Sequence, residues 1–112
     1  MSASLDDVLE LAAQTLEEYP DRWTQGALIR DRTGREISVW RECDPHSACA
    51  LGMVVLAAES MGEVGTVVSN VVDDAYVARY GDDMAAWNDY EARDAAEVAA
   101  RLRSLKDNDP DE

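Results

Sequence analysis

The stretch DPHSACALGMVVLAAESM, residues 44–61, decides the fold of this chain of 112 residues. Asp44 followed by Pro45 is typical of a helix start, with Asp as the N-cap and Pro in the first helical position. From Ala48 to Ala58 the stretch is apolar on nearly every side, and a helix with that pattern is buried all round. We therefore predict a central helix over residues 44–61, against which the other elements pack.

Two amphipathic helices are predicted near the two ends of the sequence. One begins at Ser4, with Asp7 placed as in a capping box, and its apolar stripe ends before Pro20. The other begins at Asp94, where Glu97 can reach back toward the helix start. Each has one apolar stripe, so each is expected to bury a single face.

A further helix is predicted over residues 64–80, although its valines lower the helix propensity. Spacings of three and four residues place the apolar side chains on one arc, which we expect to face the core. This arc consists of Val64, Val67, Val68, Val71, Val72 and Ala75. Residues 81–93 read as a loop with a short turn.

Residues 27–40 are predicted to form a β-hairpin. Leu28–Arg30 and Ile37–Trp40 are β-prone, and DRTG between them supplies turn residues, with Gly34 suited to a positive φ. A two-stranded ribbon is unstable alone, so it is expected to lie on the helices.

The expected fold class is mainly α (α+β), with about four helices around a central apolar helix and one hairpin. Residues 1–106 are predicted to form a single globular domain, and residues 107–112 an acidic disordered tail.

Charge is the outlying property of the chain. The chain contains twenty-four acidic and ten basic residues, which gives a net charge of -14. Such a chain is repelled by nucleic-acid backbones and anionic membranes, so direct binding to either is not expected. The first helix has an acidic side that is either solvated surface or a docking face for a basic protein partner. Its residues are Asp6, Asp7, Glu10, Glu17 and Glu18.

Nothing in the sequence indicates export or membrane insertion. The N-terminal residues lack the basic region and apolar core of a secretory signal, and no apolar run approaches 18 residues. Two cysteines do not make a disulfide framework. The expected setting is the cytoplasm of a bacterial host.

Two chemical readings of HSACALG, residues 46–52, compete with a structural one. Cys49 near a helix start, with His46 and the Asn88–Asp89 pair, would resemble an activated thiol site. Cys43, His46 and Cys49 would give three metal ligands without a clear fourth. We favour an inert core thiol, because free cysteine is usually buried and Cys49 would lie more than a turn inside the helix. No catalytic, metal or cofactor residue is predicted.

The tryptophans Trp23, Trp40 and Trp87 are interpreted as large core residues, or alternatively as anchors of an interface. After the last of them, Asn88 and Asp89 are expected to organise the loop through bonds from side chain to backbone.

Three short motifs carry a resemblance. They are WTQGA at residues 23–27, CALG at 49–52, and AWND at 86–89 followed by Arg93 and the pair Glu97–Val98. Their order and spacing resemble an uncharacterised domain family of actinobacteria and their phages. The resemblance implies no established activity, cofactor or partner. It implies a candidate structural motif made of Trp23, Gly26, Cys49, Gly52, Trp87, Asn88, Asp89 and Arg93.

The sequence therefore predicts a small acidic non-enzymatic interaction protein, encoded by a phage or an acquired element. It would bind and modulate a basic host protein, with nucleic-acid mimicry as one mode. Acidity that serves only solubility is the simpler rival. A thiol enzyme or metal site around Cys49 and His46, and a homo-oligomeric structural module, are the alternatives.

Overall fold

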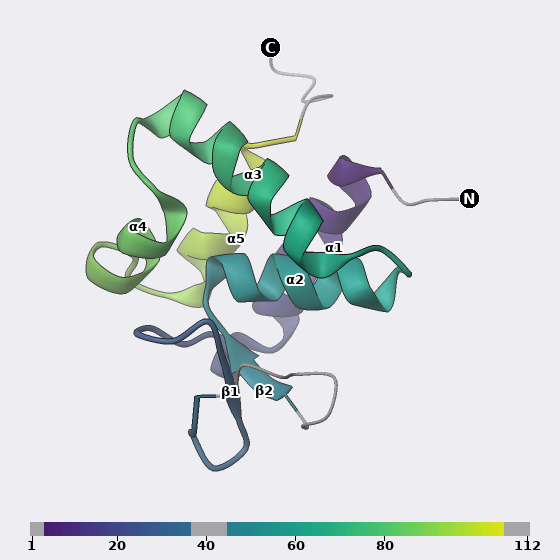
Figure 1. The fold of residues 1–112 in the computed structure, drawn as a ribbon. Coiled ribbons are helices and arrows are strands. Elements are labelled where there is room, and N and C mark those ends of the chain that lie inside the picture. Colours follow the sequence, from purple (N-terminus) through teal and green to yellow (C-terminus); the bar gives the residue numbers. More distant parts are fainter. Residues whose placement is uncertain (1–3, 37–44, 107–112) are drawn as a thin grey trace.

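The computed structural model describes residues 4–36 and 45–106 and confirms a mainly α fold with a small β-hairpin. The helices of these residues are α1 (Leu5–Glu18), the 3₁₀ turn η1 (Pro20–Arg22), α2 (Ala50–Ser60), α3 (Gly65–Tyr80), α4 (Met84–Tyr90) and α5 (Ala95–Arg103). The strands are β1 (Ile29–Asp31) and β2 (Pro45–Ala48). Figure 1 shows α2 crossing the middle of the molecule, with the strands at one end. The predicted tail, residues 107–112, lies outside the described residues.

Helices α1 and α5 begin as predicted. The Asp7 backbone N–H donates to the Ser4 hydroxyl at 3.1 Å, and the Asp7 carboxylate accepts from the Ser4 N–H, which completes the capping box. The Asp94 carboxylate accepts from the Glu97 N–H at 2.8 Å. Glu97 reaches back one residue further than Asp94, to the Arg93 N–H. The buried stripes of α1 and α5 pack against each other, and α1 also packs against α2.

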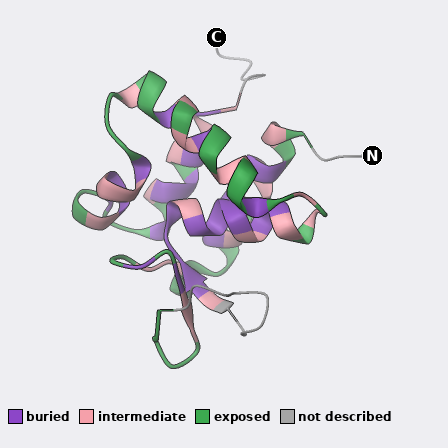
Figure 2. Ribbon diagram, viewed as in Figure 1, coloured by how far each residue is buried: buried purple, intermediate pink, exposed green. Residues whose placement is uncertain are grey.

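The central helix is confirmed, but its predicted start is wrong. Figure 2 shows α2 as largely buried, yet Pro45–Ala48 is an extended strand and Cys49 is the N-cap. The Asp-Pro signal is purely local, and pairing with β1 overrides it. Ala48 pairs with Ile29, and the Cys49 N–H donates to the Leu28 carbonyl at 3.0 Å.

The small β-hairpin is confirmed, and the strand that pairs with β1 in the described residues is β2. Strand β1 pairs antiparallel with β2, and residues 37–40 lie outside the described residues. The DRTG turn is present. The Asp31 carboxylate accepts from the backbone N–H groups of Thr33 and Arg35, and Gly34 has a φ of 88°.

Helix α3 forms as predicted, and its predicted buried arc is confirmed at Val72 and partly at Val68, but it is wrong for the other valines. Gly65, Val72 and Tyr76 are its buried residues, while three of the predicted core valines are exposed. Two packing demands rotate the helix. A Cβ at Gly65 would lie 2.7 Å from a Val55 methyl carbon, so only glycine permits this contact with α2. The Tyr76 ring is fully buried, and a tyrosine buries more area than a valine.

Residues 84–90 form the short helix α4 instead of a loop. The Asp83 carboxylate caps it by accepting from the Ala86 N–H at 2.7 Å. On its buried side, Trp87 lies 6.4 Å from the Tyr76 ring, centroid to centroid. The Arg101 guanidinium of α5 stacks over Trp87 at 4.4 Å and joins α3, α4 and α5.

Candidate functional site

Asn88 is the centre of a buried polar cluster, which we call the Asn88 node. Its Oδ1 accepts from the Trp23 indole N–H at 2.7 Å and from the Ala50 N–H at 3.0 Å. Its amide nitrogen donates to the Thr24 carbonyl and to the Asp89 carboxylate, both at 3.1 Å. The Ala50 N–H belongs to the first turn of α2, where helices lack internal acceptors. Asn88 therefore caps α2 from another part of the chain.

Two glycines of the predicted motif serve close backbone approaches beside the node. The Gly26 N–H donates to the Asp89 carboxylate at 2.9 Å, and Gly26 has a φ of 82°. A Cβ at Gly52 would lie 2.0 Å from the Leu28 carbonyl oxygen. The structure thus gathers Trp23, Gly26, Gly52, Asn88 and Asp89 around the start of α2.

Other motif residues lie apart from these contacts. The buried Trp87 packs on the Arg101 side of α4, and the exposed Arg93 pairs with Glu97 at 3.2 Å. The sequence reading missed Gln25, whose amide donates to the backbone carbonyls of Asn88 and Ala92. It also missed Arg101. Both are long polar side chains whose partners are remote in sequence, so their contacts could not be predicted locally, although Gln25 lies within the WTQGA motif.

Cys49 is a buried thiol, with 4% of its surface exposed. Burial raises its pKa, which is the opposite of what an activated nucleophile needs. His46 does not share its pocket. His46 lines a groove between α1 and α2, whereas Cys49 borders a shallow pocket of about 220 Å³ beside Asp89. Because Cys49 and His46 line different pockets, the structure does not support a thiol site built from these two residues.

The metal reading finds no support in the part of the chain that the structure describes. Nowhere in residues 4–36 and 45–106 do three His, Cys, Asp or Glu side chains gather closely enough to hold an ion. Cys43, one of the three predicted ligands, lies outside these residues.

The acidic side of α1 is partly occupied by α5. Arg103 bridges Glu10 and Glu17, at 2.9 and 2.6 Å, and Lys106 contacts Glu10 at 2.9 Å. Hydrogen bonds from Arg103 and Lys106 lower the pKa of Glu10 from 4.5 to about 2. Asp7 caps its own helix, and Glu18 is exposed. The predicted docking face is therefore not one continuous free surface.

Helix α3 carries an exposed apolar line on its outer side. Val64, Val67 and Val71 are 54%, 59% and 49% exposed. Spacings of three and four residues align them opposite the buried Tyr76. We call these three residues the valine stripe. Residues 64–72 contain no charged side chain, in a sequence that is 30% charged. A line of exposed apolar side chains makes this side of α3 a candidate interaction surface.

None of the helices in the described part of the chain has the length and apolar character needed to span a bilayer.

Comparison with known proteins supports the expectation of an uncharacterised domain family. Residues 1–108 match the model of a family of unknown function, DUF6197. The match covers almost the whole sequence, and the chain belongs to this family. It matches no curated protein and no solved structure.

Proposed function

We propose that this protein is a small non-enzymatic interaction protein that binds another protein through the valine stripe. The observation that carries the proposal is the exposure of Val64, Val67 and Val71 on an uncharged part of α3. A sequence selected only for solubility would place charged residues at such positions. Instead, the longest helix presents stiff β-branched side chains that lose little conformational freedom on contact.

The stripe is large enough to matter energetically. Full burial of a valine contributes roughly 1.5–3 kcal/mol, so covering three half-exposed valines would contribute about 3 kcal/mol in all. That corresponds to roughly a hundredfold in affinity. Charge would add steering and selectivity around this apolar centre.

The preferred partner is a protein with a basic surface beside an apolar groove. Asp74 follows Val71 by three residues, just under one helical turn, and lies on the same side of α3. The net charge of -14 favours approach to a basic partner and disfavours an acidic one. Since Glu10 and Glu17 are engaged by α5, we centre the contact on α3 instead of α1. A phage-encoded protein that acts in the bacterial cytoplasm, by competing with nucleic acid for a host protein, fits this chemistry.

The test is quantitative capture from host lysate with paired variants. Val67→Asp places a charge in the stripe. Val77→Asp makes the same change at a valine that is 44% exposed, about 15 Å further along α3 and about 80° around it. The partner should be lost at least tenfold with Val67→Asp and retained with Val77→Asp, and raising the salt concentration should release it. Equal capture by both variants would contradict the role of the stripe, and salt-independent capture would contradict the basic partner.

A homo-oligomeric module is the second candidate, and one observation favours it. Two copies could meet stripe to stripe about a twofold axis, because residues 64–72 carry no charged side chain that would repel its own copy. Sedimentation velocity distinguishes the candidates. A dimer that Val67→Asp dissociates supports self-association, whereas a monomer at all concentrations leaves the stripe for a different protein.

The thiol-enzyme alternative has its own test. A buried Cys49 with a raised pKa should react with a thiol reagent only on unfolding. Stoichiometric modification of Cys49 in the folded protein, identified by peptide mass spectrometry, would support the thiol-enzyme alternative.

A further inference from the structure

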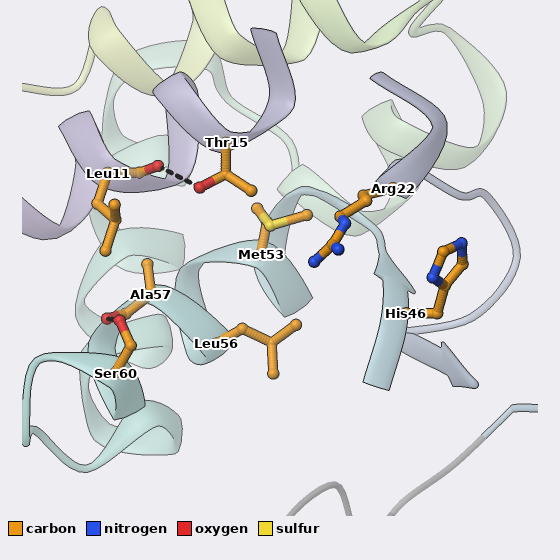
Figure 3. A pocket seen from close by; sticks show the side chains of 8 residues that line it. All are labelled: Leu11, Thr15, Arg22, His46, Met53, Leu56, Ala57 and Ser60. Atoms are coloured by element: carbon orange, nitrogen blue, oxygen red, sulfur yellow. Dashed lines mark hydrogen bonds between the residues drawn. The ribbon is translucent and has the colours of Figure 1, made fainter. Parts of the chain in front are cut away.

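A groove of about 270 Å³ lies between α1 and α2, away from the residues of the valine stripe. Leu11 and Thr15 of α1 form one wall, and residues of α2 form the other. Arg22 of η1 and His46 of β2 lie at one end, as Figure 3 shows. The α2 residues that line it are Met53, Leu56, Ala57 and Ser60.

The groove is effectively apolar along its length. The Thr15 hydroxyl donates to the Leu11 carbonyl at 2.8 Å, and the Ser60 hydroxyl donates to the Ala57 carbonyl at 2.7 Å. Each hydroxyl proton is thus used within its own helix, and apart from Arg22 and His46 at one end the remaining lining is aliphatic or thioether. Such a lining favours a hydrocarbon ligand over a polar one.

The Arg22 end has the opposite character. In Figure 3 the Arg22 guanidinium extends toward Met53 and Leu56, so its charge lies at the end of the apolar lining. Its described contact is the Tyr19 ring, 5.1 Å away, and no carboxylate of residues 4–36 or 45–106 forms an ion pair with it. By contrast, Arg103 and Lys106 are engaged by the carboxylates of α1. Among the described residues, this cation at the mouth of an apolar groove points to an anionic ligand.

We propose that this groove binds a small monocarboxylate with an unbranched apolar chain. The planar guanidinium of Arg22 suits two parallel hydrogen bonds to a carboxylate, and His46 offers a further polar contact at the same end. The hydrocarbon chain would lie between Leu11 and Leu56. The groove is slightly smaller than the roughly 300–1,000 Å³ of drug-sized ligand pockets, which favours a medium-length chain. This site is independent of the proposed protein partner.

Titration of the ¹⁵N-labelled full chain with octanoate, below its micelle concentration, tests the proposal. Acetate and 1-octanol are the matched ligands, because one lacks the chain and the other lacks the charge. Octanoate should shift backbone resonances of Thr15, Ala57 and neighbouring residues, with at least tenfold higher affinity than either control. No binding, equal binding of 1-octanol, or shifts centred on the valine stripe would overturn the proposal.

Two variants locate the two ends of the ligand. Arg22→Gln should weaken octanoate binding about tenfold, while Arg93→Gln, which removes an exposed arginine elsewhere, should not. Ala57→Met should fill part of the groove and weaken binding without removing charge. Unchanged affinity in Arg22→Gln or in Ala57→Met would contradict the assigned position of the carboxylate or of the chain. Thermal unfolding of each variant verifies that it is folded.

Discussion

The Asn88 node and the valine stripe show how differently two sequence patterns behave in one small protein. The node collects polar residues and glycines, and the structure buries Asn88 completely. The stripe collects apolar residues, and the structure leaves all three at least 49% exposed. Hydrophobicity alone would have assigned them the other way round. The difference lies in the contacts available. Every polar atom of the Asn88 side chain has a hydrogen-bond partner, so its burial is not costly. The three valines point outward because the other side of α3 packs on the core through Gly65 and Tyr76.

The sharpest way to break the node is to add a methyl group at Gly52. Because a Cβ there would lie 2.0 Å from the Leu28 carbonyl oxygen, α2 and the strand segment must separate. Gly52→Ala should cost more than about 4 kcal/mol of unfolding free energy, measured by urea denaturation. Gly34→Ala is the control, with a φ of 88° but nothing near the added atom, and should cost about 1–2 kcal/mol. Similar losses at both glycines would contradict the close approach.

Removal of the Asn88 side chain should come next. Asn88→Ala leaves the Trp23 indole N–H, the Ala50 N–H and the Thr24 carbonyl without their partner. Unsatisfied buried groups cost about 1–3 kcal/mol each, and water entry recovers part of this, so we expect a loss of about 3–4 kcal/mol. Denaturant unfolding measures it, with the exposed Asn70→Ala as control. A loss below about 1 kcal/mol would show that the node is not a stability centre.

Loss of the Glu10 ion pairs that join α1 to α5 should have a smaller, pH-dependent effect on the free energy of unfolding. The folded-state pKa of Glu10 is about 2, below its ordinary value of 4.5. The contribution of ionised Glu10 to the free energy of unfolding is therefore fully present above pH 4.5 and is lost as the pH falls toward 2. Glu10→Gln should lower the unfolding free energy by about 1 kcal/mol at pH 7.

The difference between wild type and Glu10→Gln should vanish near pH 2, as measured by unfolding at a series of pH values. Glu18→Gln, at an exposed position of the same helix, is the control. A difference that persists unchanged at the acidic end of the series would mean that the Glu10→Gln substitution disturbs packing instead of removing an ion pair.

The stripe should give the smallest effect on stability. Val67→Ala should change the unfolding free energy by less than about 0.5 kcal/mol, as is usual for surface substitutions. The same change at the buried Val72 should cost about 2 kcal/mol, because it leaves a cavity. Thermal unfolding of the two variants compares them directly. Equal losses would place Val67 in a core and remove it as a contact residue.

Local signals predicted much of the fold. The capping residues Ser4, Asp7 and Asp94 mark helix starts in sequence and do so in the structure. The apolar run of α2 predicted a buried central helix. These features were predictable because each depends on residues within a few positions of one another.

The misplaced features depend on distant partners. Asp44–Pro45 is a good helix start until β1 offers a strand partner, and that pairing cannot be read locally. The rotation of α3 depends on Val55 touching Gly65 and on Arg101 meeting Tyr76. At the candidate sites, the sequence marked Asn88 and Asp89. It did not mark the groove at Arg22, whose lining comes from four elements.

The Arg103 bridge also constrains how the chain reaches its native state. Arg103 closes on Glu10 across 93 positions of sequence, and α1 packs its apolar stripe against α5. During synthesis, α1 leaves the ribosome long before the helix that covers it. The apolar face of α1 therefore stays accessible to chaperones and proteases until α5 emerges. Folding of this protein is consequently expected to be completed only when α5 docks, so truncation within α5 should yield a degraded polypeptide instead of a smaller folded one.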